Sequence, residues 1–557
     1  MCNACAGSVL VLGLQSDPAV TSLIASAAAG MLTLLALSSQ TTAATWEELE
    51  ARKFVISGIE IVVTDVFDLS RPSENNGISK LANAVHVETR NPVVARELLF
   101  ASGEAVDAER IRETERNLRR HAFIRDARIV PVQVGDSAVT ARVEIDDAWS
   151  LLGNIDLTQT GGNLEWSARV DEVNLLGTGK RVFFEHEENI ERNANEIGYV
   201  DPQFLGSRWV FSAAYGDLSD GSSRVLFAER PYFSIETPYA TGGFFTSSDR
   251  LLTQYNHGVA VNVIPARRTS AALFASRAYR VRDRTAYRVG VTYRADESEY
   301  DAPVAFGAGL PVPDTSTRRV RGLSGTWSMV QDRSATFQNL ARIGRTEDYN
   351  LGWILSGAGG YFSTALGSET NAPFGEASVS KGWSSGSGNL MFATAAISGR
   401  HESDGWRNAG SRAAFTIYRR AGRGQTLAAQ LGAVTSTRPD SADWLYLGGR
   451  DGLRGYVDHF LAGDRRVTAS IEDRIITPWR PMGLLQAGFV AYVDAGAIRR
   501  ADTGAWSRTY ANVGAGLRFG LLKSGRGNLV LVSVAMPIVR DPGIDRLLLV
   551  LGNSVGF

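Results

Sequence analysis

The sequence contains very little cysteine. Only Cys2 and Cys5 occur among its 557 residues. A structural disulfide, a cysteine-ligated zinc site and a catalytic thiol are therefore excluded from the body of the chain. Histidine is also sparse, and the 6 histidines are scattered singly, without the spacing of a metalloprotease or zinc-finger pair. We expect no catalytic residue, no metal and no cofactor.

An excess of charge of one sign is missing too. Lys plus Arg number 58 against 59 for Asp plus Glu. Without a positive field, no nucleic-acid partner is expected. Beyond residue 44, no segment approaches 18 uninterrupted apolar residues, which argues against membrane-spanning helices. A transmembrane barrel stays possible, because its strands need only about 9–11 residues with alternating faces.

The amino terminus has the pattern of an export signal. Residues 23–37, LIASAAAGMLTLLAL, carry no charge, and the small residues Thr42 and Ala44 that follow suit signal-peptidase cleavage. We predict a signal peptide over residues 1–44 and a linker over 45–53. No Lys or Arg precedes Arg52, which a misplaced start codon or an unusual signal would explain. A retained anchor is the alternative, although the run is shorter than the roughly 20 residues of a spanning helix.

Residues 54–147 hold the only helical patterning after the signal. Asn91-Pro92 opens one predicted helix, and Asp107 caps a second that carries Ile111 and Leu118 on one face. The strand-like run GIEIVVTDVFD precedes these helices, and ARIVPVQV and AVTARVEID follow them. The order strand, helix, helix, strand, strand predicts a small α+β domain.

From Trp149 onward helix signals vanish and short alternating runs recur. The clearest run is residues 485–494, where Leu485, Phe489 and Val493 belong to an apolar face. A soluble sandwich would bury such a face against a second sheet. Alternation alone therefore leaves a sandwich and a membrane barrel both open.

Three features favour a barrel at residues 150–557. No helical layer interrupts this stretch, and a sheet that long must close or leave exposed edges. Tryptophans fall near strand ends, as at membrane interfaces: Trp209, Trp327, Trp353, Trp383, Trp479 and Trp506. The chain ends in RLLLVLGNSVGF, an in-phase strand similar to the insertion signal of bacterial outer-membrane barrels, with the residues Leu549, Leu551, Val555 and Phe557. We predict an all-β transmembrane barrel.

Several motifs then resemble one family. GGRDGLRGYVDHFLAGD (residues 448–464), ASIEDR and FVAYVDAG are similar to motifs of the outer-membrane surface-antigen barrel superfamily, which includes barrel-assembly and translocation-assembly proteins and two-partner-secretion transporters. FFEHEENI, YVDPQFLGSRW, ERPYFS and IGRTEDYNLG look like its barrel strands and turns, and residues 54–147 look like one polypeptide-transport-associated (POTRA) module. The resemblance implies 16 antiparallel strands in the bacterial outer membrane, with the module in the periplasm.

The same resemblance implies a candidate site. In that family an Arg-Gly-aromatic element lies at the tip of an extracellular loop that folds back into the lumen, matched here by Arg454, Gly455 and Tyr456. The arginine pairs with an aspartate matched by Asp494, and Glu472 is a plausible second acceptor. Both carboxylates lie opposite the apolar faces of their strands, so they should point inward, where a guanidinium needs such partners. From spacing alone, the simpler interpretation is that Arg454 and Asp494 are ordinary solvated residues of a hairpin and a strand.

Two functions follow from different classes. The resemblance implies a barrel that inserts or translocates an unfolded polypeptide received by the POTRA module, with outer-membrane lipid as a partner and periplasmic accessory proteins as a further class left open. The client would pair with an open sheet edge, for which ARIVPVQV and AVTARVEID are candidates. The alternative is a structural or passive diffusion-pore barrel. An enzyme is not expected, because GWSSG around Ser384 lies between two strand-like runs and not between a strand and a helix.

Overall fold

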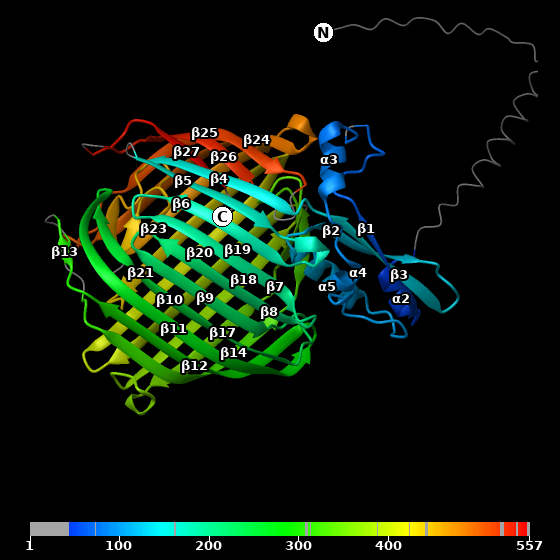
Figure 1. Cartoon of the computed structure of the whole chain (residues 1–557), viewed down its shortest axis with the longest axis horizontal. Coiled ribbons are helices and arrows are strands. Elements are labelled where there is room, and N and C mark those ends of the chain that lie inside the picture. Colours follow the sequence, from blue (N-terminus) through cyan, green and yellow to red (C-terminus); the bar gives the residue numbers. More distant parts are fainter. Residues whose placement is uncertain are drawn as a thin grey trace, which may run out of the picture.

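The computed structural model describes residues 44–72, 74–160, 163–306, 310–311, 314–386, 388–422, 424–440, 444–523, 529–541 and 544–553. Nearly all of the expected signal peptide lies outside these ranges. The described chain forms an α/β module that sits at one end of a β-barrel (Figure 1). Among its described helices, none is both long and apolar enough to span a bilayer.

The module contains a three-stranded sheet in the order β1-β3-β2. β1 (Val55–Thr64) pairs with β3 (Ala138–Asp147) in parallel, and β2 (Ile124–Val132) pairs with β3 antiparallel. Every second residue of β3 is buried, as expected of a strand covered on one face by helices. AVTARVEID is therefore the central strand, and the prediction that it could offer a free edge is wrong.

Both predicted helices of the module are present, as α4 (Asn91–Ala95) and α5 (Ala108–Arg120). The Asp107 side chain caps α5 by accepting a hydrogen bond from the Arg110 backbone N–H at 2.9 Å. Ile111 and Leu118 of α5 are 1% and 0% exposed and lie in the module's core.

Two further helices were not predicted, α2 (Trp46–Ala51) and α3 (Gly77–Val85). α2 corrects the expected linker over residues 45–53. Thr45 and Glu48 form a reciprocal capping box, and Leu49 is 0% exposed in the module's core. The spacing of Thr45 and Glu48 was the available sequence signal for this helix.

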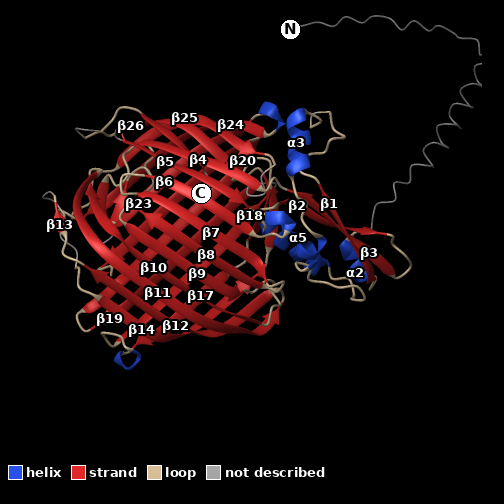
Figure 2. Cartoon of the chain, viewed as in Figure 1, coloured by secondary structure: helices blue, strands red, loops and turns tan. Residues whose placement is uncertain are grey.

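Twenty wall strands close into a barrel within the described residues (Figure 2). They are β4 (Leu151–Thr160), β5 (Asn163–Glu172), β6 (Arg181–Glu188), β7 (Asn193–Phe204), β8 (Trp209–Leu218), β9 (Gly221–Arg230), β10 (Tyr239–Asn256), β11 (Val259–Arg282), β12 (Thr285–Tyr300), β14 (Arg318–Gln331), β17 (Ile354–Phe362), β18 (Ala372–Ser385), β19 (Asn389–Glu402), β20 (Gly405–Gly422), β21 (Gln425–Thr437), β23 (Leu461–Ile476), β24 (Leu485–Arg500), β25 (Tyr510–Leu521), β26 (Leu529–Pro537) and β27 (Leu548–Asn553). β27 lies beside β4 and closes the wall. The expected closed barrel is confirmed.

Four short strands and three 3₁₀ turns complete the barrel domain. β13 (Val304–Ala305) and β22 (Leu445–Leu447) pair with β11 and β23, respectively. β15 (Ser334–Gln338) and β16 (Thr346–Asn350) form a separate two-stranded sheet. The 3₁₀ turns are η1 (Leu175–Gly177), η2 (Thr364–Leu366) and η3 (Pro481–Gly483).

The expected number of 16 strands is wrong, because several connections are shorter than the estimate assumed. Asp283 and Arg284 join β11 to β12 with φ values of 49° and 56°. His257 and Gly258 join β10 to β11 with φ values of 55° and 74°. Two successive positive φ values are typical of the tightest hairpin turns. Each strand and its connection therefore take about 20 residues on average, and not the ~25 that 16 strands would use.

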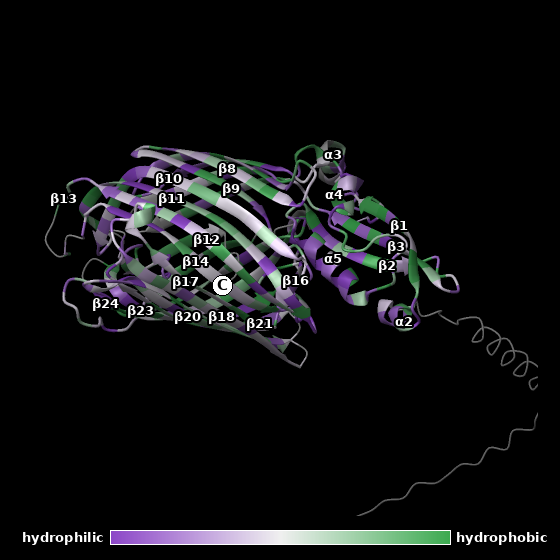
Figure 3. Ribbon diagram, turned by 90° about the horizontal axis from the view of Figure 1, so that it is seen from below, coloured by the Kyte–Doolittle hydropathy of each residue, from purple (hydrophilic) through white to green (hydrophobic). Residues whose placement is uncertain are grey.

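The outward face of the wall is apolar at alternate positions. Leu273, Val291, Ile471 and Phe489 are 66%, 61%, 60% and 51% exposed. Figure 3 shows hydrophobic and hydrophilic residues alternating along the strands. This is the pattern of a wall that faces lipid on one side and water on the other.

Five of the six expected interface tryptophans are at least 40% exposed; the sixth, Trp209, is half-buried. Trp327 lies within β14 and not at its end. Farther from the module, the outward face of β10, β11 and β12 carries an ion-paired row, in which Arg267 lies 3.5 Å from Asp249 and 3.3 Å from Glu299. These wall strands are also long, and β11 has 24 residues whereas β27 has 6.

A buried polar network joins the module to the connection between β5 and β6. Asp147, 0% exposed, accepts hydrogen bonds from the Thr89 N–H and hydroxyl, both at 2.7 Å, and lies 3.1 Å from His86 Nε2. Asn174, after β5, donates to the Thr89 hydroxyl at 2.9 Å and accepts from the Gly179 N–H at 2.7 Å. The orientation of the module on the barrel therefore depends on buried hydrogen bonds and not only on surface contacts.

Candidate functional site

The chain between β22 and β23 enters the barrel; we call residues 448–460 the lumenal loop. At one end of it, Arg450 forms an ion pair with Glu165 of β5. At the other, the Phe460 carbonyl accepts a hydrogen bond from the His257 N–H in the β10–β11 turn at 2.8 Å. The loop therefore extends from the wall that carries it to strands on other sides of the lumen.

Arg454 is held by two carboxylates of the wall. Its Nε and Nη2 donate to Asp494 at 2.9 and 2.7 Å, and its Nη1 donates to Glu472 at 2.5 Å. The side chains of Asp494 and Glu472 are 2% and 6% exposed, and that of Arg454 is 19% exposed. The fork on Asp494 is the bidentate geometry that binds a carboxylate most strongly. The structure thus brings together the arginine and both acceptors expected from the resemblance.

Neighbouring side chains also hold Asp494 and the guanidinium in place. Asp494 also accepts hydrogen bonds from the Ser470 hydroxyl at 2.8 Å and from Asn512 Nδ2 at 2.9 Å. The guanidinium carbon of Arg454 lies 3.5 Å from the centre of the Tyr492 ring. A cation is favoured over an aromatic face, so Tyr492 completes a cradle for the guanidinium.

Tyr456 anchors the loop two residues farther on. It is 0% exposed, and its hydroxyl lies 2.9 and 2.7 Å from the Ala511 and Val539 carbonyls, within donating distance of both. Its ring contacts Phe460 and Tyr510, with centroids 5.3 and 5.5 Å apart. The loop therefore closes on a small apolar cluster beside the charged pairs.

Gly455 permits the close approach of the loop to the wall. A Cβ atom at this position would lie 2.6 Å from the Asn512 Cβ. We expect Gly455→Ala to displace the loop, weaken the bond between Asn512 and Asp494, and raise the frequency of channel openings in planar bilayers. Gly375→Ala is the matched control, because its nearest atom would lie at an ordinary 3.5 Å. Equal opening frequencies in the two variants would contradict this role of Gly455.

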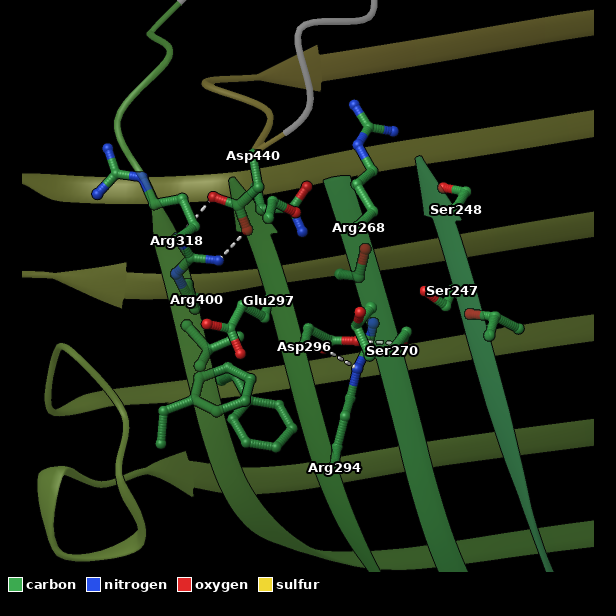
Figure 4. Close-up of a pocket in the computed structure, with 18 of the residues that line it drawn as sticks. Ser247, Ser248, Arg268, Ser270, Arg294, Asp296, Glu297, Arg318, Arg400 and Asp440 are labelled. Carbon is green, nitrogen blue, oxygen red and sulfur yellow. Dashed lines mark hydrogen bonds and ion pairs between the residues drawn. The ribbon is translucent and has the colours of Figure 1, made fainter. Parts of the chain in front are cut away.

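Away from the loop, the lumen contains a polar cavity of about 620 Å³ (Figure 4). Arg400 of β19 pairs there with Asp440, with Nη2 and Oδ1 2.6 Å apart. Asp296 of β12 accepts hydrogen bonds from Arg294 and Ser270. Charged and hydroxyl side chains line most of this space, so it is a water-accessible part of the lumen and not a pocket for an apolar ligand.

The predicted carboxyl-terminal signal is only partly described. Leu549 of β27 is 40% exposed and Leu551 is half-buried. Val555 and Phe557 lie outside the described residues.

Sequence reasoning missed several residues of the site. Ser470 lies on the same inward face as Glu472, so strand periodicity was sufficient to find it. Tyr492 and Asn512 lie on β24 and β25, and their contacts depend on how these strands pair. Arg450 was missed because its partner Glu165 is 285 residues away in the sequence.

The comparisons with known proteins give matches in structure only. No family model and no curated protein matches the sequence. Among solved structures, BamA from Haemophilus ducreyi lacking POTRA domains 1–3 matches at 14% identity over 89% of this chain and 84% of that one, with a TM-score of 0.38. CdiB from Escherichia coli matches at 12% identity over 97% and 100%, with a TM-score of 0.45.

CdiB from Acinetobacter baumannii matches at 13% identity over 90% of this chain and 73% of that one, with a TM-score of 0.42. Similarity at this level concerns the fold and does not indicate the activity of this chain.

Proposed function

We propose that this chain is an outer-membrane barrel that inserts or translocates polypeptide clients, which its module receives in the periplasm as a POTRA domain. The proposal rests on the two edges of the module's sheet, because the backbone groups of one edge are occupied and those of the other are open. An open edge can add an extended peptide through main-chain hydrogen bonds, which are independent of the client's sequence.

The edge formed by β2 is closed by side chains. The Ile129 N–H donates to Glu115 at 2.7 Å, and the Ile129 carbonyl accepts from the Trp46 indole at 2.7 Å. The Ala127 carbonyl accepts from Arg119 at 2.8 Å, and Pro131 has no N–H to offer. Although β2, which contains the run ARIVPVQV, is an edge strand, its outward backbone N–H and C=O groups at residues 127 and 129 already have hydrogen-bond partners.

The edge formed by β1 is the open one. At its start, Ile56 pairs with residues 103 and 104. From Gly58 to Thr64, the described part of the chain places no backbone or side-chain partner on the outer side of the β1 main chain. We infer that an extended client pairs here, beside β1.

The alternative of a passive diffusion pore is less favoured. A pore requires a lumen open to solutes, whereas the lumenal loop is seated by buried ion pairs and an aromatic cluster. Low basal conductance in planar bilayers would agree with the client-handling proposal. A steady large current from the parent protein would favour the pore.

Photo-crosslinking in cells tests the proposal. A photoreactive residue at Val62 of β1 should capture polypeptides, and the same residue at Val130 of β2 is the matched control. Val62 pairs with Glu144 and Val130 with Arg142, which share one face of the sheet, and both valines are half-buried. One captured secreted protein would indicate dedicated export, and many barrel precursors would indicate assembly. Capture at Val130 equal to that at Val62 would contradict docking on β1.

A further inference from the structure

The connection between β14 and β17 is not a simple turn. Residues 332–351, which we call the mouth hairpin, contain β15 and β16 paired only with each other. In Figure 3, β16 lies at the end of the barrel that faces α5. The hairpin therefore leaves the wall at the module's side of the lumen.

The tip of the mouth hairpin reaches a distant part of the wall. Arg518 of β25 donates to the Ala341 carbonyl at 3.1 Å. A Cβ atom added to Gly520 of β25 would lie 2.5 Å from the Cβ atom of Ile343. Ile343 therefore packs directly against this strand. Six wall strands lie between β17 and β25 in the barrel. On the way, the hairpin shares a buried apolar cluster with Leu390 of β19, Tyr418 of β20 and Ala428 of β21, so it lies across the inner side of this part of the wall.

The tip is built as a compact unit. Glu347, 7% exposed, accepts hydrogen bonds from the backbone N–H groups of Leu340 at 2.8 Å and Ala341 at 3.2 Å, and from the Tyr349 hydroxyl at 2.7 Å. Leu340 is 1% exposed and belongs to an apolar cluster with side chains of the wall. A loop ordered in this way has a specific seat and is not merely packed against the opening.

Helix α5 of the module holds the other side of the hairpin. Arg119 donates two hydrogen bonds to Asp348, at 2.7 and 3.0 Å, and Arg116 donates to Asp332 at 2.9 Å. These four side chains are between 10% and 16% exposed. Burial opposes ionisation of Asp332, but Arg116 and its other partners outweigh burial and hold its pKa below the usual value.

We propose that the mouth hairpin is a second closure of the lumen, on the module's side, and that its contacts with α5 make the position of the module control it. Movement of α5 away from the barrel removes Arg116 from Asp332, which keeps Arg284 as a cation. It also removes Arg119 from Asp348, which keeps only a hydrogen bond from the Thr336 hydroxyl. Asp348, left without a cation, then favours release of its part of the hairpin into water. The lumenal loop and the mouth hairpin are thus two closures in series, and the mouth hairpin is the one whose ion pairs with α5 are described above.

Thiol accessibility tests the seat of the hairpin directly. Ala341→Cys places a thiol at a position that is 8% exposed, and the natural cysteines, Cys2 and Cys5, fall within the expected signal peptide. In the purified full chain, a water-soluble maleimide should label this thiol slowly. Asp348→Arg places a second cation against Arg119 and should speed labelling at least about tenfold.

Two further variants make the result specific. The exchange Arg119→Asp with Asp348→Arg restores opposite charges and should return labelling toward the slow rate. Asp283→Arg makes the same charge change in an exposed turn, where the side chain is 85% exposed, and should leave the rate within about twofold of the parent. Retained β circular dichroism shows that each variant is folded. Fast labelling in the parent, or equal rates in Asp348→Arg and Asp283→Arg, would overturn the proposal.

Conductance gives a second measurement that needs no client. In an Arg454→Ala background, where the lumenal loop is unseated, Asp348→Arg should increase the size of each current step, and the charge exchange should reverse that increase. If the size of the current step does not depend on residue 348, the proposal of a second closure is also wrong. Failure of this proposal leaves docking on β1 untouched, because neither measurement involves a client.

Discussion

Arg454→Ala is expected to raise the frequency of channel openings roughly a hundredfold in planar bilayers. The substitution leaves Asp494 without a cation and Glu472 with Arg474 alone, although both carboxylates are almost fully buried. Removing one partner of a buried ion pair costs about 3 kcal/mol or more, and each 1.4 kcal/mol corresponds to a factor of ten in population. The mouth hairpin should still limit the size of each opening.

A double-mutant comparison assigns this effect to the pair. Asp494→Ala alone should raise the opening frequency as well. The double variant should open no more often than either single variant, because both substitutions remove the same interaction. Asp451→Ala is the control within the same loop, since the Asp451 side chain is 30% exposed and its partner Arg466 also donates to the Tyr446 carbonyl, so its loss should matter less. Additive effects of Arg454→Ala and Asp494→Ala would contradict the pairing as the element that seats the loop.

Asp147→Ala is expected to destabilise the module by about 3 kcal/mol. The Thr89 N–H and hydroxyl lose a shared acceptor in a site without access to water, and unsatisfied buried donors are costly. For a domain of this size, such a loss lowers the unfolding midpoint by roughly 10–20 °C. Thermal proteolysis of the full chain in detergent measures this midpoint as the temperature at which half of the module has been digested.

Asp146→Ala is the matched control for Asp147. The Asp146 side chain is 35% exposed and pairs with Arg125 at 2.9 Å, so water can replace its partners. We expect its midpoint to stay within a few degrees of the parent's. Equal midpoints for the two variants would show that the buried network does not hold the module.

The sequence was informative wherever one local rule decided the structure. Asp107 and the stripe of Ile111 and Leu118 predicted α5, and period-two alternation predicted that Glu472 and Asp494 point inward. The pairing of these carboxylates with Arg454 came from the family resemblance, because hydrogen bonds between residues up to 40 apart leave no local pattern.

The mouth hairpin shows why the rest was not predictable. Its strands have 5 residues each, and the run IGRTEDYNLG looks like an ordinary barrel strand and turn. Its seat depends on Arg518, 177 residues from Ala341, and on Arg119, 229 residues from Asp348. The number of strands was missed for a related reason, since turn length is set by positive φ values at residues such as Asp283 that are not glycines.

The length of the wall strands around β11 determines how far the barrel extends beyond a bilayer. The row formed by Asp249, Arg267 and Glu299 faces outward, and charges of this kind do not lie in hydrocarbon. At about 3.3 Å per residue, the 24 residues of β11 are about 80 Å long, well beyond the ~25 Å apolar band of a tilted barrel wall. The barrel wall at β10–β12 is therefore taller than a bilayer's apolar layer. In a bilayer, the upper part of these three strands would stand in water above the lipid headgroups.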